Sequence, residues 1–361
     1  YDEWKRIRSG NVDVVIGTRS AVFAPLPNLG LIVIDEEQEH SYKSQNIPSY
    51  HARDVAKYRC WQSKALLLLG SATPSLESMY SAETGKYRLF RLTRRFNEQR
   101  LPQVIIADMK QELRRGYGGT IGSELLQALR ENIERGEQSI LFLNRRGEST
   151  LITCPECGYT FSCPRCSVSL TYHSANRRVM CHYCGYSRPE PASCPDCGGR
   201  LKYVGAGTQK VERELRELLP GVEILRMDAD TVSATHTHED ILTRFRDEKI
   251  PILLGTQMVA KGLDFENVTL VGVLSADQML YINDFRAQER AFSLITQVVG
   301  RSGRGSKTGR AIIQTLTPDS EVIRLAARQD YDAFYRRELE LRRVLNNPPL
   351  CDIIAITASG V

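Results

Sequence analysis

No apolar run in the 361-residue sequence is long enough to span a bilayer, and no signal-peptide pattern opens it. There is no low-complexity tract, and the only internal repeat is a set of cysteine pairs. An excess of one charge sign is also lacking, because 48 Lys and Arg stand against 43 Asp and Glu. These absences argue against a membrane-spanning or secreted protein. The mild basic excess permits a nucleic-acid partner without demonstrating one.

What remains is the composition of a globular protein of two or three domains, with 42% hydrophobic and 25% charged residues. Cys60 and Cys351 are lone cysteines, which we expect to be free or buried thiols in a reducing cytoplasm. The chain starts at Tyr1 and ends in Ser-Gly-Val, and we expect it to be a fragment of a longer protein.

The most informative stretch is 154–197, where eight cysteines form four Cys-x-x-Cys pairs. Two residues between cysteines place both sulfurs on one side of a tight turn, at the spacing that a tetrahedral ion needs. Glycine follows three of the pairs and supplies the positive φ that such a turn demands. A disulfide framework or a redox site is the alternative, but paired turns in a chain of this kind favour metal. We predict two zinc sites with four ligands each, drawn from Cys154, Cys157, Cys163, Cys166, Cys181, Cys184, Cys194 and Cys197.

The division of the four pairs between two ions is open on spacing, because three pairings are available. The 14-residue loop from Cys166 to Cys181 resembles the long arm of an ordinary zinc ribbon, so the second and third pairs can share one ion. The outer pairs would then close the other site around them.

On both sides of the cysteines, short runs of Val, Ile and Leu alternate with helical patterns, which predicts two parallel α/β lobes. Strands are expected at 11–18, 29–35, 64–71, 89–92, 104–108, 139–144, 222–228, 250–255, 268–274 and 310–315. Helices are expected to start at 52 and to span 75–85, 124–135, 210–219, 239–247, 285–299 and parts of 320–345.

Polar residues follow several of these strands, at the edge where an open α/β sheet has its ligand crevice. Asp35 and Glu36 come directly after the run LIVI, and carboxylates there suit Mg²⁺ binding and water activation in an NTPase. A solvated strand end is an equally ordinary interpretation. The segment 39–53 interleaves aromatic residues with Lys43 and Arg53, which is typical of a loop that binds single-stranded nucleic acid, or of an exposed loop.

Taken in order, the motifs resemble those of superfamily 2 helicases, and most closely the replication-restart helicases. The resemblance runs from about residue 12 to residue 317, and its specificity lies in the set of motifs together with four cysteine pairs inside the second lobe. The motifs are Thr-Arg-Ser-Ala at 18–21, Asp-Glu-Glu at 35–37, Gly-Ser-Ala-Thr-Pro-Ser at 70–75, Gly-Thr-Gln-Met-Val-Ala-Lys-Gly-Leu-Asp-Phe at 255–265 and Gln-Val-Val-Gly-Arg-Ser-Gly-Arg at 297–304.

The resemblance implies two RecA-like parallel-sheet helicase lobes, with a zinc-binding insertion in the second. It also implies that the outer cysteine pairs share one zinc ion and the inner pairs the other. The expected domains are the C-terminal part of lobe one at 1–95, lobe two at 96–150 and 201–320, the insertion at 151–200, and a helical linker with the start of a C-terminal domain at 321–361.

An ATP site with Mg²⁺ is implied as well. Asp35 and Glu36 would be the Walker B pair, with Asp35 holding Mg²⁺ and Glu36 polarising the attacking water. Gln38 stands where the family usually has His, which changes the hydrogen bonding on the γ-phosphate side. Ser71 and Thr73 would couple hydrolysis to lobe movement. Lobe two would contribute Gly255, Gly262, Gln297, Arg301 and Arg304, with Arg304 as the arginine finger.

The implied activity is that of an ATP-dependent 3′→5′ DNA helicase that binds stalled or forked DNA and promotes primosome assembly and replication restart. Implied partners are DNA forks, D-loops and single strands, single-strand DNA-binding protein, other primosome proteins and the replicative helicase loader. We expect a monomer in the bacterial cytoplasm, associated with the nucleoid. The implied DNA contacts are Thr18, Arg19, Tyr42, Lys43, Tyr50, Arg53, Thr256 and Gln257.

One expected motif is missing, because the sequence contains no Gly-x-x-x-x-Gly-Lys-Ser/Thr phosphate-binding loop. We therefore assign helicase activity to the parent protein and expect this chain alone to hydrolyse ATP poorly or not at all. One alternative is a non-enzymatic, zinc-bearing DNA-binding scaffold on a helicase fold, which the complete set of polar motif residues disfavours. Another is a double-strand translocase without unwinding, which the insertion disfavours.

Overall fold

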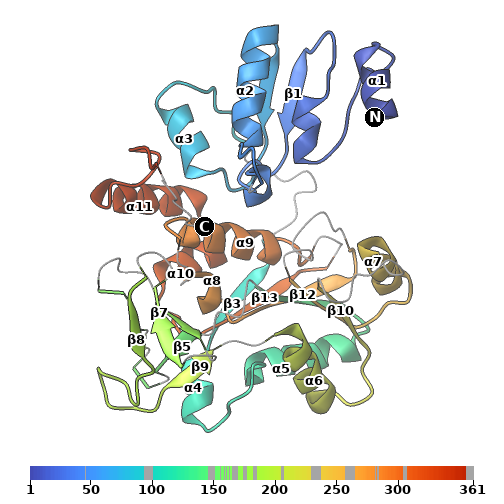
Figure 1. Cartoon of the computed structure of the whole chain (residues 1–361). Coiled ribbons are helices and arrows are strands. Elements are labelled where there is room, and N and C mark those ends of the chain that lie inside the picture. The colour runs from blue at the N-terminus through green and yellow to red at the C-terminus, as the bar shows by residue number, and fades with distance from the viewer. Residues whose placement is uncertain are drawn as a thin grey trace. The chain divides into compact units, whose positions relative to one another are not determined.

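A computed structural model describes residues 1–44, 46–92, 101–144, 151–154, 156–157, 159, 161, 163–164, 170–173, 177–181, 185–204, 207–228, 237–256, 265–280, 282, 284–303 and 307–354. The chain divides into two units, Tyr1–Phe90 with Cys351–Val361, and Arg91–Leu350. Each unit has its own parallel sheet (Figure 1). The predicted boundary between 95 and 96 falls among residues outside the described ones and stays a prediction.

The first unit is built on two short parallel strands, β1 (Leu31–Ile34) and β2 (Leu66–Leu69). The connection between them contains α2 (Ala52–Ser63), which packs Ala52 and Ala56 against Ile34 of β1. The remaining helical elements are α1 (Asp2–Arg8), η1 (Arg19–Phe23), η2 (His40–Tyr42) and α3 (Leu76–Glu83).

Two strand predictions are wrong, one within this unit and one where the chain passes from it to the second unit. Residues 11–18 and 89–92 are extended or irregular rather than strands. Val14 and Ile16 are 72% and 94% exposed, and no strand among the described residues pairs with their segment. An alternating apolar run becomes a strand only where a neighbour accepts its backbone hydrogen bonds, and the described part of the chain supplies none here.

The second unit holds a six-stranded, all-parallel sheet in the order β10-β11-β4-β12-β13-β3. The strands lie close to where the sequence predicts them, since long Val, Ile and Leu runs with both faces buried leave little ambiguity. They are β3 (Gln103–Asp108), β4 (Gln138–Leu143), β10 (Ile224–Met227), β11 (Ile252–Gly255), β12 (Val268–Leu274) and β13 (Arg310–Thr315).

Helices cover both faces of this sheet. α5 (Ser123–Glu134) and α6 (Thr208–Leu218) lie on one face, and α9 (Ala287–Val299) and α10 (Glu321–Arg328) lie on the other (Figure 1). Gly272 of β12 permits the close approach of α5, because a Cβ there would lie 2.6 Å from Leu141 and 3.0 Å from Leu125. The other helices are α4 (Met109–Arg114), α7 (His238–Asp247), α8 (Asp277–Leu280) and α11 (Tyr331–Val344).

The cysteine-rich insertion leaves the second unit after β4 and returns before α6. Its neck is an antiparallel pair, β5 (Leu151–Thr153) with β9 (Lys202–Val204). Beyond the neck, β6 (Thr171–His173), β7 (Arg178–Met180) and β8 (Ser187–Pro189) form a three-stranded antiparallel sheet. The apolar core of the insertion is small, with Ile152, Phe161, Leu170 and Val179 at its centre.

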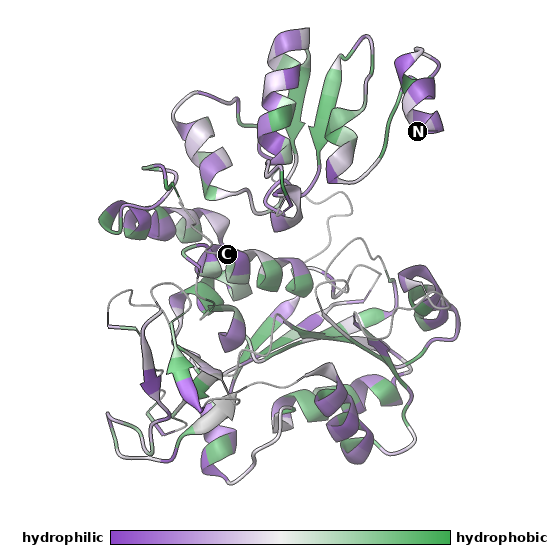
Figure 2. Cartoon of the chain, in the orientation of Figure 1, coloured by the Kyte–Doolittle hydropathy of each residue, from purple (hydrophilic) through white to green (hydrophobic). Residues whose placement is uncertain are grey.

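The predicted fold class, parallel α/β with a cysteine-rich insertion in the second unit, is thereby confirmed. Among the described residues, no helix is both long and apolar enough to cross a membrane. Figure 2 shows the apolar strands of the second unit enclosed by helices whose outer faces are polar.

Candidate functional site

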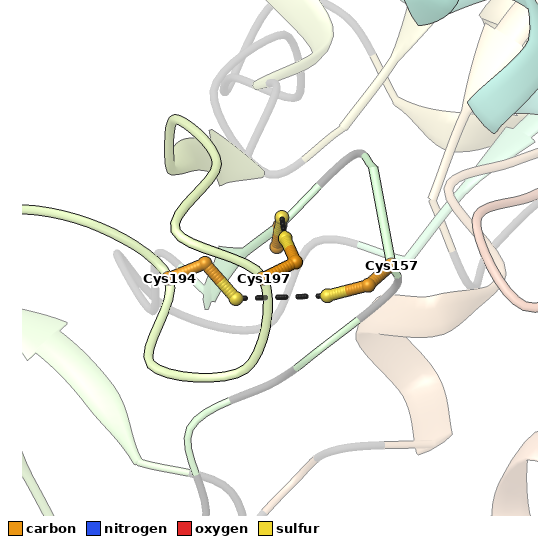
Figure 3. A group of neighbouring side chains, drawn as sticks. Cys157, Cys194 and Cys197 are labelled. Carbon is orange, nitrogen blue, oxygen red and sulfur yellow. Dashed lines mark hydrogen bonds between the residues drawn. The ribbon is translucent and has the colours of Figure 1, made fainter.

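Four cysteines of the insertion come together in space. The sulfur atoms of Cys154, Cys157, Cys194 and Cys197 all lie within 4.8 Å of one another. Cys157 and Cys194 face each other at 3.6 Å between their sulfurs, as Figure 3 shows, and the sulfurs of Cys154 and Cys197 are 3.4 Å apart. The structure thus brings together the first and last Cys-x-x-Cys pairs, which are the outer pairs of the sequence.

The turns that hold these cysteines follow from local sequence. The Cys194 amide donates to the Gly199 carbonyl, and the Gly198 amide donates back to the Cys194 carbonyl, each at 2.9 Å. Gly198 has φ +73°, which glycine adopts without strain. At the first pair, the Cys154 amide donates to the Tyr159 carbonyl.

The geometry fits a zinc ion. Zinc–sulfur bonds of about 2.3 Å in a tetrahedron place the sulfurs about 3.8 Å apart, close to the observed 3.4 and 3.6 Å. A disulfide requires about 2.05 Å, so the cysteines are not bonded to each other. Four thiolate donors without carboxylate or open position are typical of a structural zinc site, whose ion would stabilise the fold and supply no catalytic chemistry.

The second predicted site is only partly within the described residues. Cys163 and Cys181 are both 1% exposed and belong to the core of the insertion. The Cys181 amide donates to the Tyr186 carbonyl and the Gly185 amide to the Cys181 carbonyl, which repeats the turn at Cys194. Cys166 and Cys184 lie outside the described residues. A second zinc ion therefore stays a prediction.

In the first unit, the acidic segment follows β1 directly. The Glu36 amide donates to the Asp35 carboxylate at 3.0 Å, and Glu36 has φ +48°. The Tyr42 hydroxyl donates to the Asp35 carbonyl at 2.8 Å. Burial, and then the charge of Asp35, raises the pKa of Tyr42, so its hydroxyl remains a donor at neutral pH.

A chain of hydrogen bonds joins this segment to the turn after β2. The Gln38 amide donates to the Glu36 carboxylate at 2.6 Å, and the Ser71 hydroxyl donates to the Gln38 carbonyl oxygen at 2.6 Å. The Thr73 amide donates to the Ser71 hydroxyl at 3.0 Å. Glu36, Gln38, Ser71 and Thr73 are thus connected within one unit. The pairing of β1 with β2 explains this, because parallel strands deliver their carboxyl ends to the same edge.

A buried ion pair lies beside this chain, and sequence reasoning missed it. The guanidinium of Arg53 donates to the Glu37 carboxylate at 2.8 Å and to the hydroxyls of Ser75 and Ser78 at 2.7 and 2.9 Å. Glu37 also accepts the Ser75 amide at 2.6 Å. The structure therefore gives Arg53 partners inside the unit, and a DNA contact by Arg53 stays a prediction. The one sequence signal was a third carboxylate after Asp35 and Glu36.

The aromatic segment is tied to the predicted DNA-contacting turn. Arg19 donates to the carbonyls of Ser41 and Lys43 at 2.9 and 3.0 Å, and its guanidinium lies 5.7 Å from the Tyr50 ring centroid. Thr18 precedes η1 at its N-terminus and is exposed. Five of the predicted DNA contacts, Thr18, Arg19, Tyr42, Lys43 and Tyr50, are thus gathered in one region of the first unit.

The predicted motor residues of the second unit lie at strand and helix ends. Thr256 follows β11 and is half-buried, Gln297 lies on α9, and Arg301 follows α9. Gln257, Gly262 and Arg304 lie outside the described residues. Their roles stay predictions.

Two family models match the middle of the chain. Residues 163–189 match the PriA DNA helicase Cys-rich region (CRR) domain, and residues 198–306 match the helicase conserved C-terminal domain. With the parallel six-stranded sheet, these matches place the chain in the class of helicase-type proteins.

Curated proteins similar to this chain include replication restart proteins named PriA. That of Bacillus subtilis (strain 168) is 49% identical over 360 residues, which cover 99% of this chain and 45% of the relative. That of Synechocystis sp. is 42% identical over 100% of this chain and 44% of the relative. That of Haemophilus influenzae is 40% identical over 96% of this chain and 47% of the relative. The chain is similar to these PriA proteins over nearly its whole length, and it spans about half the length of the curated relatives it matches.

Among solved structures, RecG bound to a three-way DNA junction is similar with a TM-score of 0.47 and 15% identity, covering 94% of this chain and 34% of that one. A likeness at this level adds nothing to the functional argument.

Proposed function

We propose that this chain is the motor and zinc-binding part of an ATP-dependent 3′→5′ DNA helicase that acts in replication restart. The observation that carries the proposal is the 49% identity to a replication restart protein PriA over 99% of the chain. The polar motif residues that the chain carries, Glu36 and Arg304 among them, support an active motor rather than a scaffold.

In this proposal, Asp35 would hold Mg²⁺, and Glu36 would polarise the water that attacks the γ-phosphoryl group. The hydrogen bond from Gln38 orients the Glu36 carboxylate, and Ser71 fixes Gln38 in turn. Displacement of one residue in this series of hydrogen bonds would shift the next residue. The series is therefore suited to pass a change at the Glu36 carboxylate to the turn at Ser71 and Thr73.

From the second unit, Gln297 and Arg301 would reach the nucleotide, and Gly262 would bind it. Arg304 would be the arginine finger, because charge builds on the γ-phosphoryl oxygens and a cation there is typically worth ~10³–10⁵ in rate.

DNA would run over the aromatic segment, with Thr18, Arg19, Tyr42, Lys43 and Tyr50 in contact and Arg53 nearby, and over Thr256 and Gln257 in the second unit. Bases would stack on the tyrosines and phosphates would pair with the cations. The hydrogen bond from the Tyr42 hydroxyl to the backbone carbonyl of Asp35 supports a link between the DNA-binding segment and the residue whose carboxylate would hold Mg²⁺.

The zinc-bearing insertion would separate strands at the fork or dock restart partners. Those partners would be single-strand DNA-binding protein, other primosome proteins and the replicative helicase loader, for a monomer associated with the bacterial nucleoid in the cytoplasm. D-loops, stalled forks and single strands would be its DNA substrates.

The test is DNA-stimulated ATP hydrolysis and unwinding by the full-length protein, on forks with 3′ or 5′ single-stranded tails. Glu36→Ala and Arg304→Ala should each abolish turnover without loss of fold, whereas Arg246→Ala should not, because Arg246 is exposed and bonded only to its neighbour Asp247 among the described residues. Unwinding of one fork type settles the polarity. Tight fork binding by a wild-type protein without turnover would instead favour a zinc-bearing DNA-binding scaffold.

A further inference from the structure

α9, which carries Gln297 and leads to Arg301, is covered by α11 as well as by the sheet. The rings of Phe292 on α9 and Phe334 on α11 are stacked, with centroids 4.2 Å apart and an interplanar angle of 10°. Both helices belong to the same unit. Helix α11 therefore packs against α9, and the C-terminal end of α9 carries the predicted motor residue Gln297 and leads to Arg301.

At the other end of this contact lies a buried arginine. Arg342 of α11 is 1% exposed, and its guanidinium donates to the Glu289 carboxylate on α9 at 2.7 Å. It also donates to Glu338 one helical turn earlier at 3.2 Å and to the Pro348 carbonyl at 3.0 Å. The Phe285 ring centroid lies 5.0 Å from the guanidinium. One side chain thus joins α9, α11 and the segment that follows α11.

Glu289 is the principal counter-charge of Arg342. Burial raises the pKa of Glu338 to about 7, so this carboxyl is partly neutral at physiological pH. Arg337, the other cation near Glu338, lies 3.9 Å from it and is engaged by Glu321 of α10 and Gln288 of α9.

A buried ion pair is a poor source of stability, because desolvation of both charges offsets their attraction and an apolar pair of similar volume often serves as well. What charged hydrogen bonds add is a defined position, since the guanidinium is planar and its donors point in fixed directions. The stacked Phe292 and Phe334 rings alone would allow small slides of α11 along α9.

We propose that Arg342 is a positioning residue for the motor: through Glu289 it fixes the axial position of α9 and thereby the placement of Gln297 and Arg301. At 1.5 Å per residue, Gln297 lies about 12 Å along the helix from Glu289, so a shift at Glu289 is carried rigidly to it. This inference rests on the proposed function, and it extends the motor machinery to a helix that carries no helicase motif.

The experiment compares variants of the full-length protein by kcat and KM for ATP at saturating DNA, by melting temperature, and by hydrogen exchange at 297–303. The variants are Arg342→Met, Arg342→Lys, the double variant Glu289→Met with Arg342→Met, and Phe334→Leu. Phe334→Leu is the matched control, because it weakens the same helix–helix contact without touching the ion pair.

Arg342→Met should lower kcat by roughly tenfold to a hundredfold, as expected for a small misplacement of reacting groups. Arg342→Lys should recover part of that loss. The double variant should regain a melting temperature near that of the wild type, while its kcat stays low. Phe334→Leu should lower the melting temperature with kcat changed less than about twofold.

Recovery of both kcat and melting temperature in the double variant would overturn the inference, and so would an equal kcat loss in Phe334→Leu. A wild-type protein that hydrolyses no ATP would instead overturn the proposed function. In that case hydrogen exchange at 297–303 still tests whether Arg342 fixes the position of α9. Unchanged protection of these residues in Arg342→Met would contradict that.

Discussion

The two parallel sheets of this chain are covered differently. In β4, β11 and β12 of the second unit, every residue is buried. In the first unit, Leu31, Val33, Leu66 and Leu68 of β1 and β2 are 50%, 55%, 65% and 48% exposed, and they alternate with more buried neighbours. A similar run of apolar residues therefore accompanies a sheet buried on both faces in the second unit, and a sheet with one exposed and one partly buried face in the first.

The difference shows what organises each region. The second unit is held by apolar burial on both faces of its sheet. The first unit has a small core around Val22, Ile34, Ala52 and Ala56, and its strand ends are tied by the polar network of Glu37 and Arg53. The insertion has the smallest dependence on apolar burial of the three regions. Its apolar core is too small to keep a chain folded alone, and we expect metal binding by the cysteines to supply the stability that is lacking.

The largest effect is expected from removal of the four-cysteine site. Cys194→Ser should lower the bound zinc by one ion per chain and unfold most of the insertion, because structural zinc contributes on the order of 10 kcal/mol to such folds. The six-stranded sheet should stay folded, since its core is separate. Zinc analysis and hydrogen exchange over 151–204 and 101–144 would measure both effects.

Cys351→Ser is the matched control and should leave the zinc content unchanged, because Cys351 lies outside the cluster. If the insertion of the Cys194→Ser variant, freed of zinc, kept its full protection from hydrogen exchange, its apolar core would be sufficient to keep it folded. The proposed difference in what stabilises the three regions would then be wrong.

A smaller loss is expected from the polar network of the first unit. Glu37→Gln keeps the shape of the side chain but leaves the buried Arg53 guanidinium without its counter-charge, which typically costs about 3–5 kcal/mol. Urea unfolding followed by hydrogen exchange in α2 would measure the change.

Asp54→Asn is its control on the same unit, since Asp54 is exposed and lies 3.9 Å from Lys57; it should cost less than about 0.5 kcal/mol. A double variant that removes both Glu37 and Arg53 should cost less than the sum of the single changes. Additive losses would mean that the two side chains do not act as a pair.

The most direct comparison is between one leucine of each sheet. Leu141→Ala in β4 should cost about 2–5 kcal/mol, because the side chain is fully buried and leaves a cavity. Leu68→Ala in β2 should cost less than about 1 kcal/mol in this chain, because its side chain is already half in water.

Repeating the leucine pair in the full-length protein sharpens this result. A cost for Leu68→Ala that rises toward that of Leu141→Ala would show that the exposed face is covered there. Equal costs in this chain itself would contradict the difference between the two sheets.

Much of the second unit could be predicted from its sequence. Runs such as those of β4 and β12 are apolar and short, and their length favours a buried strand over a helix. The run at 11–18 misled the same reasoning, because it resembles a strand locally and lacks a pairing neighbour among the described residues. The local sequence pattern indicates which secondary structure a segment favours, whereas strand pairing also requires a neighbouring strand.

The candidate site divides in the same way. The Cys-x-x-Cys turns are local, so spacing and the following glycine identified Cys154, Cys157, Cys194 and Cys197 as ligands. Their grouping into one cluster depends on the fold, because spacing left three pairings open. No local pattern identified the partners in the Glu37–Arg53 and Glu289–Arg342 pairs, since the two residues of each pair are 16 and 53 positions apart.

By itself, the sequence determined the ligand turns, the buried strands and the identity of the polar residues at strand ends, because each depends on neighbours within a few positions. Only the tertiary structure decided which cysteines lie together, that Gln38 meets Ser71, that Arg53 is paired with Glu37, and that α11 reaches α9. Those are contacts between segments far apart in the chain. They form because strand pairing and helix packing bring distant residues within a few ångströms, which no local pattern encodes.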